Sequence, residues 1–126
     1  MPQKKIFIVD DEVEVLEALS KRLKDDGYEP VTATSGREAV RKVQAMMPDL
    51  ILMDIVLPDI DGSEAVRLIQ QDPKTRSIPI VFLSGIVSNE DKEQKPEVKV
   101  GGWNYPAIGK PFPYEALLKI IKANLN

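Results

Sequence analysis

The 126-residue sequence contains no cysteine and no histidine. The lack of cysteine excludes disulfides, thiol catalysis and cysteine-ligated zinc. The lack of histidine excludes Ser-His-Asp chemistry, histidine metal ligands and phosphorylation of this chain on histidine. Any chemistry that the chain carries must therefore use carboxylates, hydroxyls, lysines or a bound ion.

Long apolar runs and a large excess of one charge are also missing. No apolar run approaches the roughly 20 residues of a membrane-spanning helix, and the N-terminus leads into a short apolar run rather than a signal-peptide core. We therefore expect a cytoplasmic protein that binds no membrane. The chain has 17 basic and 20 acidic side chains, a net charge of −3. Without a run of like charges, it has no electrostatic footprint for nucleic acid.

Three unbroken apolar runs predict strands that are buried on both faces. They occupy residues 6–9, 50–53 and 80–83. Continuous apolarity of this kind is typical of parallel sheets that helices cover on both sides. Weaker runs at 30–33 and 107–108 suggest two more strands.

Helical patterns separate these runs. Apolar side chains recur at helical spacing over residues 12–26, 36–47, 63–71 and 113–125. The alternation predicts right-handed βαβ units in one α/β domain over residues 1–126. Residues 88–102 are the exception, because they are rich in charge, contain Pro96 and leave only residues 89–95 for a marginal helix.

Polar side chains stand at the ends of four predicted strands. They are Asp10, Asp11, Asp54, Ser84 and Lys110. Ligands of open α/β sheets bind at the carboxyl ends of the strands. Two carboxylates about 4 Å apart repel by roughly 4 kcal/mol at an effective dielectric of 20, so a divalent cation would relieve an acidic pocket there. Oxygen ligands without histidine or cysteine favour Mg²⁺.

A magnesium ion would make this acidic pocket able to receive a phosphoryl oxygen. Lys110 offers a positive charge to another phosphoryl oxygen, and Ser84 offers a hydroxyl donor. A carboxylate beside them is a candidate phosphoryl acceptor. On this argument, replacing Asp10 or Asp11 with Asn weakens Mg²⁺ binding and leaves the metal-free protein at least as stable.

Each of these residues also has an ordinary structural interpretation. Asp11 with Glu14 fits a helix capping box, and Asp54 fits a loop acid or helix cap. Ser84 fits a turn residue and Lys110 a solvated surface charge. The joint arrangement at four strand ends favours the functional interpretation over these four separate ones.

The chain resembles the receiver domains of bacterial two-component response regulators. The matching stretches are residues 6–12 (IFIVDDE), 50–54 (LILMD), 57–62 (LPDIDG), 83–85 (LSG) and 110–112 (KPF). The resemblance implies a flavodoxin-like, doubly wound sheet of five parallel strands in the order 2-1-3-4-5, here with an irregular or shortened fourth helix. It also implies a cis peptide bond before Pro111.

The resemblance further implies a role for each site residue. Asp54 would be the phosphoacceptor, Lys110 would pair with a phosphoryl oxygen, and Ser84 would bind the phosphoryl group and carry the conformational signal. The Mg²⁺ ligands would be Asp10, Asp11, Asp54 and the backbone carbonyl of Val56. The donor would be a phosphohistidine on a sensor histidine kinase or histidine phosphotransfer protein, and the chain would catalyse only its own phosphorylation and dephosphorylation.

The match is weakest on the face that the family uses for output, formed here by residues 88–102, the last strand and the last helix. Family members generally carry Phe or Tyr three residues before the lysine, where this chain has Ala107. Two interpretations stay open. Either Tyr105 or Trp103 replaces that aromatic, or both pack a loop onto the sheet.

Three other functions compete with this interpretation. A haloacid-dehalogenase-like phosphatase would need an acid two residues after the nucleophile, where Val56 stands. A flavodoxin-like nucleotide binder would need a phosphate loop, and no G-x-G-x-x-G or P-loop pattern occurs. The main alternative is a receiver-fold interaction module that works without phosphorylation, although an unused carboxylate cluster would cost stability. Because the last predicted helix ends near Asn126, we expect no output domain and a separate, unknown protein target.

Overall fold

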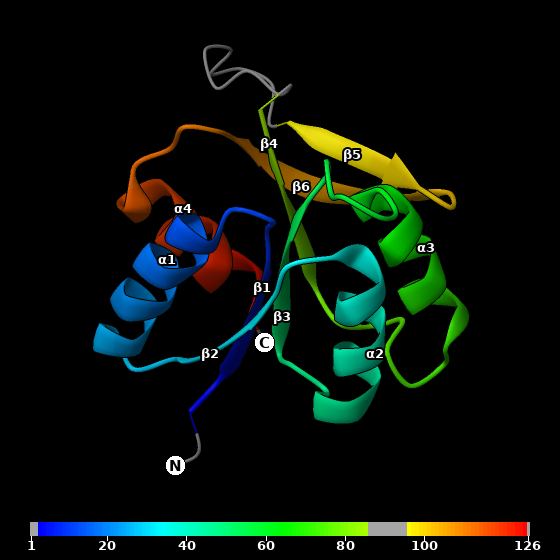
Figure 1. The fold of residues 1–126 in the computed structure, drawn as a ribbon, viewed down its shortest axis with the longest axis horizontal. Coiled ribbons are helices and arrows are strands. Elements are labelled where there is room, and N and C mark those ends of the chain that lie inside the picture. The colour runs from blue at the N-terminus through cyan, green and yellow to red at the C-terminus, as the bar shows by residue number, and fades with distance from the viewer. Residues whose placement is uncertain (1–2, 86–95, 126) are drawn as a thin grey trace.

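The unbroken apolar runs form the centre of the sheet. The computed structural model describes residues 3–85 and 96–125. Its strands are β1 (Lys5–Val9), β2 (Glu29–Ala33), β3 (Leu50–Asp54), β4 (Ile80–Ser84), β5 (Glu97–Val100) and β6 (Trp103–Gly109). Its helices are α1 (Val13–Asp25), α2 (Gly36–Met46), α3 (Gly62–Gln71) and α4 (Tyr114–Asn124). Figure 1 shows α1 and α4 on one side of the sheet and α2 and α3 on the other.

The strand order confirms the predicted fold class. The order is β2-β1-β3-β4-β6-β5, and each pair from β2 to β6 is parallel. The predicted order 2-1-3-4-5 is therefore correct, with β6 as the fifth parallel strand. None of the helices in the described part of the chain is long and apolar enough to cross a membrane.

The sheet differs from the prediction in its sixth strand. Strand β5 pairs antiparallel with β6, so the prediction of five strands was wrong by one edge strand. The cause is a hairpin, in which Gly101 and Gly102 have φ of +57° and +84° and join the two strands by the left-handed turn that glycine favours. The predicted short helix over residues 89–95 lies outside the described residues.

Alternation along the strands divides the core into two layers. Phe7 and Val9 of β1 face α2 and α3, whereas Ile6 and Ile8 face α1 and α4, and all four are fully buried. Strands β3 and β4 alternate in the same way. This two-sided burial explains why the runs contain no polar residue until the strand ends.

The four predicted helices are confirmed, and each end lies within one residue of its predicted position. The alternative interpretation of Asp11 as the cap of α1 does not hold, because the N-cap is Glu12 and it makes no side-chain capping hydrogen bond. At α2, by contrast, Ser35 Oγ accepts a hydrogen bond of 3.2 Å from the backbone N–H of Glu38. The peptide bond between Lys110 and Pro111 is cis, as the resemblance implied.

Candidate functional site

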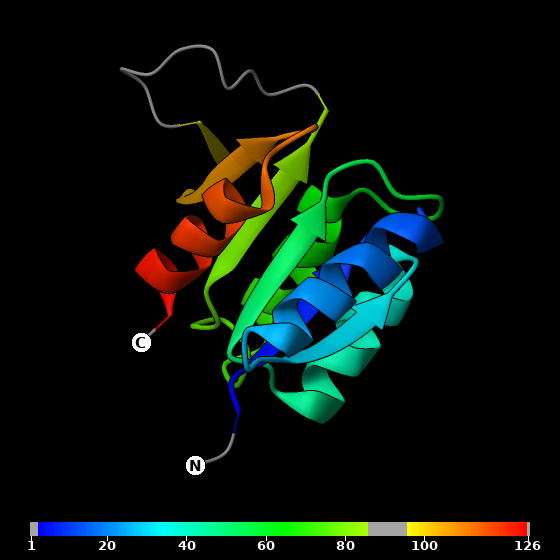
Figure 2. The same cartoon turned by 90° about the vertical axis from the view of Figure 1, so that its left-hand side faces the viewer.

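The predicted site residues meet at the carboxyl edge of the sheet. Strands β1, β3, β4 and β6 are consecutive neighbours, and Figure 2 shows the arrowheads of β3 and β4 pointing to the same edge. Asp10 follows β1, Asp54 ends β3, Ser84 ends β4 and Lys110 follows β6. Residues far apart in the chain are thereby placed within reach of one another.

Lys110 joins the two buried carboxylates of this site. Its Nζ donates to Asp10 Oδ2 at 2.5 Å and to Asp54 Oδ2 at 3.0 Å. The Lys110 side chain is 20% exposed, whereas that of Asp10 is fully buried and that of Asp54 is 10% exposed. The ammonium group therefore offsets part of the repulsion between the two acids.

Backbone N–H groups occupy the remaining oxygen of each carboxylate. Asp10 Oδ1 accepts from the N–H of Glu12 at 2.9 Å, and Asp54 Oδ1 accepts from the N–H of Val56 at 3.3 Å. Both side chains are held in one orientation from two sides. Such fixed positions are what a reacting carboxylate needs.

Burial and charge act against each other at Asp54. Burial raises the pKa of the Asp54 carboxyl above its usual value, and the neighbouring Asp10 carboxylate adds to this, while Lys110 lowers it. Burial alone would lower the pKa of Lys110, but its hydrogen bonds and charge interactions with Asp10 and Asp54 raise it. Lys110 thus remains an ammonium group throughout the neutral pH range.

Ser84 lies beside the paired charges. Its side chain is buried, and its backbone carbonyl accepts from the N–H of Lys110 at 2.8 Å. It directly follows Leu83, the register partner of Asp54, and is itself paired with Gly109. The strand register therefore places this hydroxyl residue next to both the acid and the lysine.

The loop after Asp54 is anchored at two points. Asp59 accepts hydrogen bonds of 2.8 and 3.0 Å from the N–H groups of Gly36 and Arg37 at the start of α2. Although burial raises it, the backbone donors Ile60, Arg37 and Gly36 lower the pKa of Asp59 to about 2. Gly62 N–H donates to the carbonyl of Ile55 at 2.7 Å. These contacts hold the loop against the start of α2 and against the residue that follows β3.

A group of three acids at this edge fits a hard cation. Oxygen atoms of Asp10, Asp11 and Glu12 all lie within 4.8 Å of one another. Oxygen-only ligands that include exposed carboxylates suit Mg²⁺, which keeps several of its waters. Glu12 was not among the predicted ligands, although it directly follows the two aspartates. Among the described residues, Asp54 contacts this group through Lys110 rather than as a member of it.

The structure separates the expected effects of replacing Asp10 and Asp11. Asp10 is buried and bonded to Lys110, so Asp10→Asn removes an attractive contact as well as a repulsive charge. Asp11 is exposed beside Asp10 and Glu12. We expect Asp11→Asn to change the metal-free free energy of unfolding by less than about 0.5 kcal/mol and to reduce the rise in Tm caused by Mg²⁺. Melting curves with EDTA and with Mg²⁺ measure both effects, and clear destabilisation in EDTA would contradict this assignment.

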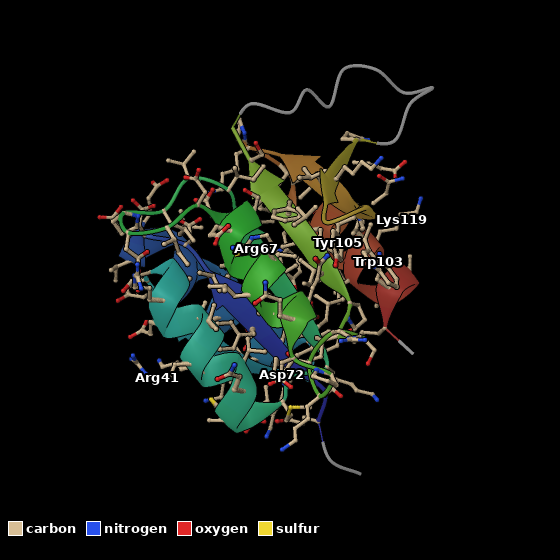
Figure 3. The ribbon with its side chains drawn as sticks, turned by 90° about the vertical axis from the view of Figure 1, so that its right-hand side faces the viewer. Arg41, Arg67, Asp72, Trp103, Tyr105 and Lys119 are labelled. Atoms are coloured by element: carbon tan, nitrogen blue, oxygen red, sulfur yellow. The ribbon has the colours of Figure 1, made fainter. Side chains whose placement is uncertain are left out.

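The two aromatic residues of β6 occupy different environments. Tyr105 is buried; its hydroxyl accepts from Gln70 Nε2 at 2.5 Å, and its ring packs edge-on against Phe82 with centroids 5.9 Å apart. Trp103 is 63% exposed. Figure 3 labels both on the β5–β6 hairpin. The packing interpretation is therefore confirmed for Tyr105 and wrong for Trp103, and a switching role of either stays a prediction.

Ala107 marks the position where the family carries its aromatic residue. It is buried and lies opposite Phe82 in the β4–β6 register. Tyr105 lies two residues earlier on β6, so it points to the same face of the sheet but farther from Lys110. Its contact with Gln70 connects the hairpin to α3.

Comparison with protein families tests the resemblance independently of the site geometry. The family model described as "Response regulator receiver domain" matches residues 6–122. The alkaline phosphatase synthesis transcriptional regulatory protein PhoP of Bacillus subtilis is 33% identical over 123 residues, which cover 98% of this chain and 49% of PhoP. The chain thus spans about half the length of the curated relatives it matches.

Solved structures agree with this result. The chemotaxis protein CheY4 of Vibrio cholerae is 32% identical, with a TM-score of 0.83, and the match covers 98% of this chain and all of CheY4. The receiver domain of the sensor histidine kinase PA1611 from Pseudomonas aeruginosa is 28% identical, with a TM-score of 0.79 and 98% coverage of both chains. That structure has a magnesium ion coordinated in its active-site cleft.

Proposed function

Because this chain belongs to the response regulator receiver domains of two-component systems, we propose that it is a phosphoacceptor switch whose acceptor is Asp54. The observation that carries this proposal is the position of Lys110 Nζ, within 3.0 Å of Asp54 Oδ2 and bonded to Asp10 as well. An ammonium group at that place can neutralise the charge of an arriving phosphoryl group. Receiver domains interact with histidine kinases or phosphotransfer proteins.

The proposed reaction transfers one phosphoryl group to this chain. An Asp54 carboxylate oxygen attacks the phosphorus of a phosphohistidine, the phosphorus–nitrogen bond breaks, and the imidazole leaves with that electron pair and takes up a proton. The product is an acyl phosphate on Asp54. Lys110 would pair with one phosphoryl oxygen, and Ser84 would donate to another. Mg²⁺, when bound, would neutralise phosphoryl charge.

The acids fit the cation that this reaction needs. We propose that Asp10 and Asp11 hold Mg²⁺ together with Asp54 and the backbone carbonyl of Val56, and the exposed carboxylate of Glu12 is close enough to contribute. The magnesium ion in the PA1611 receiver domain supports this assignment.

The proposal also covers where the switch acts and on what. We place the domain in the cytoplasm, with a sensor histidine kinase or histidine phosphotransfer protein as its phosphodonor. We expect it to catalyse only its own phosphorylation and dephosphorylation, and therefore to show no turnover on a panel of phosphomonoesters. Output would pass through β5, β6 and α4 to a separate protein target.

Incubation with acetyl phosphate and Mg²⁺, followed by intact mass measurement, tests the proposal. We expect the wild type to gain one phosphoryl group and Asp54→Asn to gain none. Asp61→Asn is the matched control, because Asp61 is an exposed acid on the neighbouring loop whose side chain makes no helix-capping bond, and it should be modified like the wild type.

The same measurement distinguishes the phosphoacceptor function from the main alternative. If the wild type gains no phosphoryl group under conditions that modify a control receiver domain, the phosphorylation-independent interaction module is the better interpretation. Modification of Asp54→Asn to the wild-type extent would instead assign the acceptor to another residue.

A further inference from the structure

The outer edge of strand β5 offers a surface that takes no part in the contacts of the proposed phosphorylation site. Within residues 3–85 and 96–125, β5 is the last strand of the sheet order, and β6 is its one strand neighbour. It has the sequence Glu-Val-Lys-Val. An edge strand presents backbone donors and acceptors that can pair with another strand.

The antiparallel ladder shows which backbone groups face outward. The N–H of Ala107 in β6 donates to the carbonyl of Pro96 at 3.0 Å, so the backbone of residue 96 faces β6. Backbone direction alternates along an antiparallel strand, and Val98 therefore also faces β6. It follows that the N–H and C=O groups of Glu97 and Lys99 face away from the sheet.

The side chains of β5 divide in the same alternating way. Val98 and Val100 pack toward the core layer under α3, and Val98 remains half-buried. Glu97 and Lys99 are exposed on the opposite face. The residues whose backbone faces outward are thus the two that carry opposite charges.

We propose that two copies of this chain pair through β5 as antiparallel strands related by a two-fold axis at Val98. In this register, Glu97 of each copy lies directly opposite Lys99 of the other. These residues form the hydrogen-bonded pairs, because their backbone groups face outward. The two Val98 side chains meet at the axis, where the strands approach most closely.

Charge selects this register over its neighbours. A shift that centres the axis on Glu97 places that carboxylate opposite its own copy, and a shift that centres it on Lys99 places two ammonium groups together. Like charges directly opposite each other destabilise a strand pair. A one-residue shift that brings Val98 opposite a charged residue pairs outward-facing backbone groups of one copy with inward-facing groups of the other. The hydrogen bonds between the strands are then lost. The second copy is therefore the occupant whose charges match this edge by symmetry.

The interaction is expected to be weak and to end at a dimer. A four-residue strand gives a contact well below the roughly 1,200 Å² of a stable interface, so we expect a dissociation constant on the order of 0.1 to 1 mM. Two-fold pairing uses the same edge on both copies, so it ends at the dimer and does not extend into fibres.

Sedimentation of the unphosphorylated protein over a concentration series to about 1 mM tests the proposal. We expect the average mass to rise from one chain toward two. Glu97→Lys and Lys99→Glu each place like charges opposite each other, and either one should weaken the dimer by about tenfold or more. An equimolar mixture of these two variants restores opposite charges at every pair, so we expect it to dimerise like the wild type.

Lys21→Glu is the matched control, because Lys21 is an exposed residue of α1 and its substitution changes the net charge by the same amount as Lys99→Glu. This control should dimerise normally. A protein that stays monomeric at 1 mM overturns the proposal. So does a dimer that survives both single reversals, or a mixture that stays monomeric. None of these results depends on Asp54, so they leave the proposed function untouched.

Discussion

Gly62→Ala is expected to destabilise the folded protein by about 3 kcal/mol or more. A Cβ atom at this position would stand 2.0 Å from the carbonyl oxygen of Asp54, 2.9 Å from its carbonyl carbon and 3.0 Å from the Cα of Ile55. All three atoms belong to the backbone at the end of a buried strand. Rotation of a side chain therefore cannot relieve the clash, and the loop must move away from Asp54.

Movement of this loop also breaks a contact that supports the site. The N–H of Gly62 donates to the carbonyl of Ile55 at 2.7 Å, and the N–H of Val56 in the same loop donates to Asp54. We therefore expect the remaining folded fraction of Gly62→Ala to be phosphorylated more slowly than the wild type. Urea denaturation gives the free energy of unfolding, and intact mass against time gives the phosphorylation rate.

Gly85→Ala is the control for this prediction. Gly85 follows Ser84 on the same edge of the sheet, and within residues 3–85 and 96–125 a Cβ added there has no atom within 4 Å beyond Gly85 itself and its chain neighbours. We expect its free energy of unfolding to lie within about 0.5 kcal/mol of the wild type. Equal stability of Gly62→Ala and the wild type would mean that the loop is not packed against Asp54 as described.

The sequence predicts the central sheet well because burial on both faces leaves a strong signal. Residues 6–9 and 50–53 are fully buried, and such unbroken apolarity is typical of strands that helices cover on both sides. The helices were equally clear, since each carries one apolar stripe. The strand order, however, was predicted from the resemblance to receiver domains, because local sequence patterns alone do not determine it.

Strand β5 was missed because its signal is short and mixed. Its four residues alternate in polarity, as a half-buried edge strand does, but they lie in a charged stretch next to Pro96. The Gly101-Gly102 pair that follows is a hairpin signal. The hairpin also depends on tertiary contacts, such as the bond from Gln70 Nε2 to the carbonyl of Val100 at 3.0 Å, which sequence spacing cannot predict.

The identity of the site residues was predictable, but their contacts were not. Strand ends place Asp10, Asp54 and Lys110 at one edge, and the sequence suggested an acidic pocket whose repulsion a divalent cation would relieve. In the structure the lysine already lies between two of the acids. The ion-pair partners of a long flexible side chain depend on which groups lie near it in the folded structure. The pairing of Lys110 can therefore be predicted only once the positions of the strands are known.

Lys110→Met is expected to destabilise the metal-free protein by about 3 kcal/mol at neutral pH. The substitution keeps a side chain of similar length but removes the positive charge between Asp10 and Asp54. Removing one partner from a buried ion pair leaves an uncompensated charge, and here two carboxylates are left facing each other. Urea denaturation in EDTA measures the loss.

The pH dependence of this variant has a defined sign. Burial raises the pKa of Asp54 above its ordinary value of 3.8, Asp10 raises it further, and Lys110 is the main group that lowers it. Without Lys110, the Asp54 carboxyl therefore binds its proton more tightly in the folded protein than in the unfolded chain. The stability that this proton contributes is fully present below the unfolded pKa and is lost as the pH rises through the raised folded pKa. The deficit of Lys110→Met relative to the wild type should shrink on going from about pH 7 to about pH 5.

Two further variants separate charge from packing. Lys119→Met removes an exposed lysine of α4 and should change the free energy of unfolding by less than about 0.5 kcal/mol. Combining Asp10→Asn with Lys110→Met removes one of the two opposed acids, so the double variant should be more stable than Lys110→Met alone. Mg²⁺ should stabilise Lys110→Met more than it stabilises the wild type, because the cation supplies the missing positive charge. Equal stability of Lys110→Met and the wild type in EDTA at neutral pH would show that the lysine does not compensate these acids.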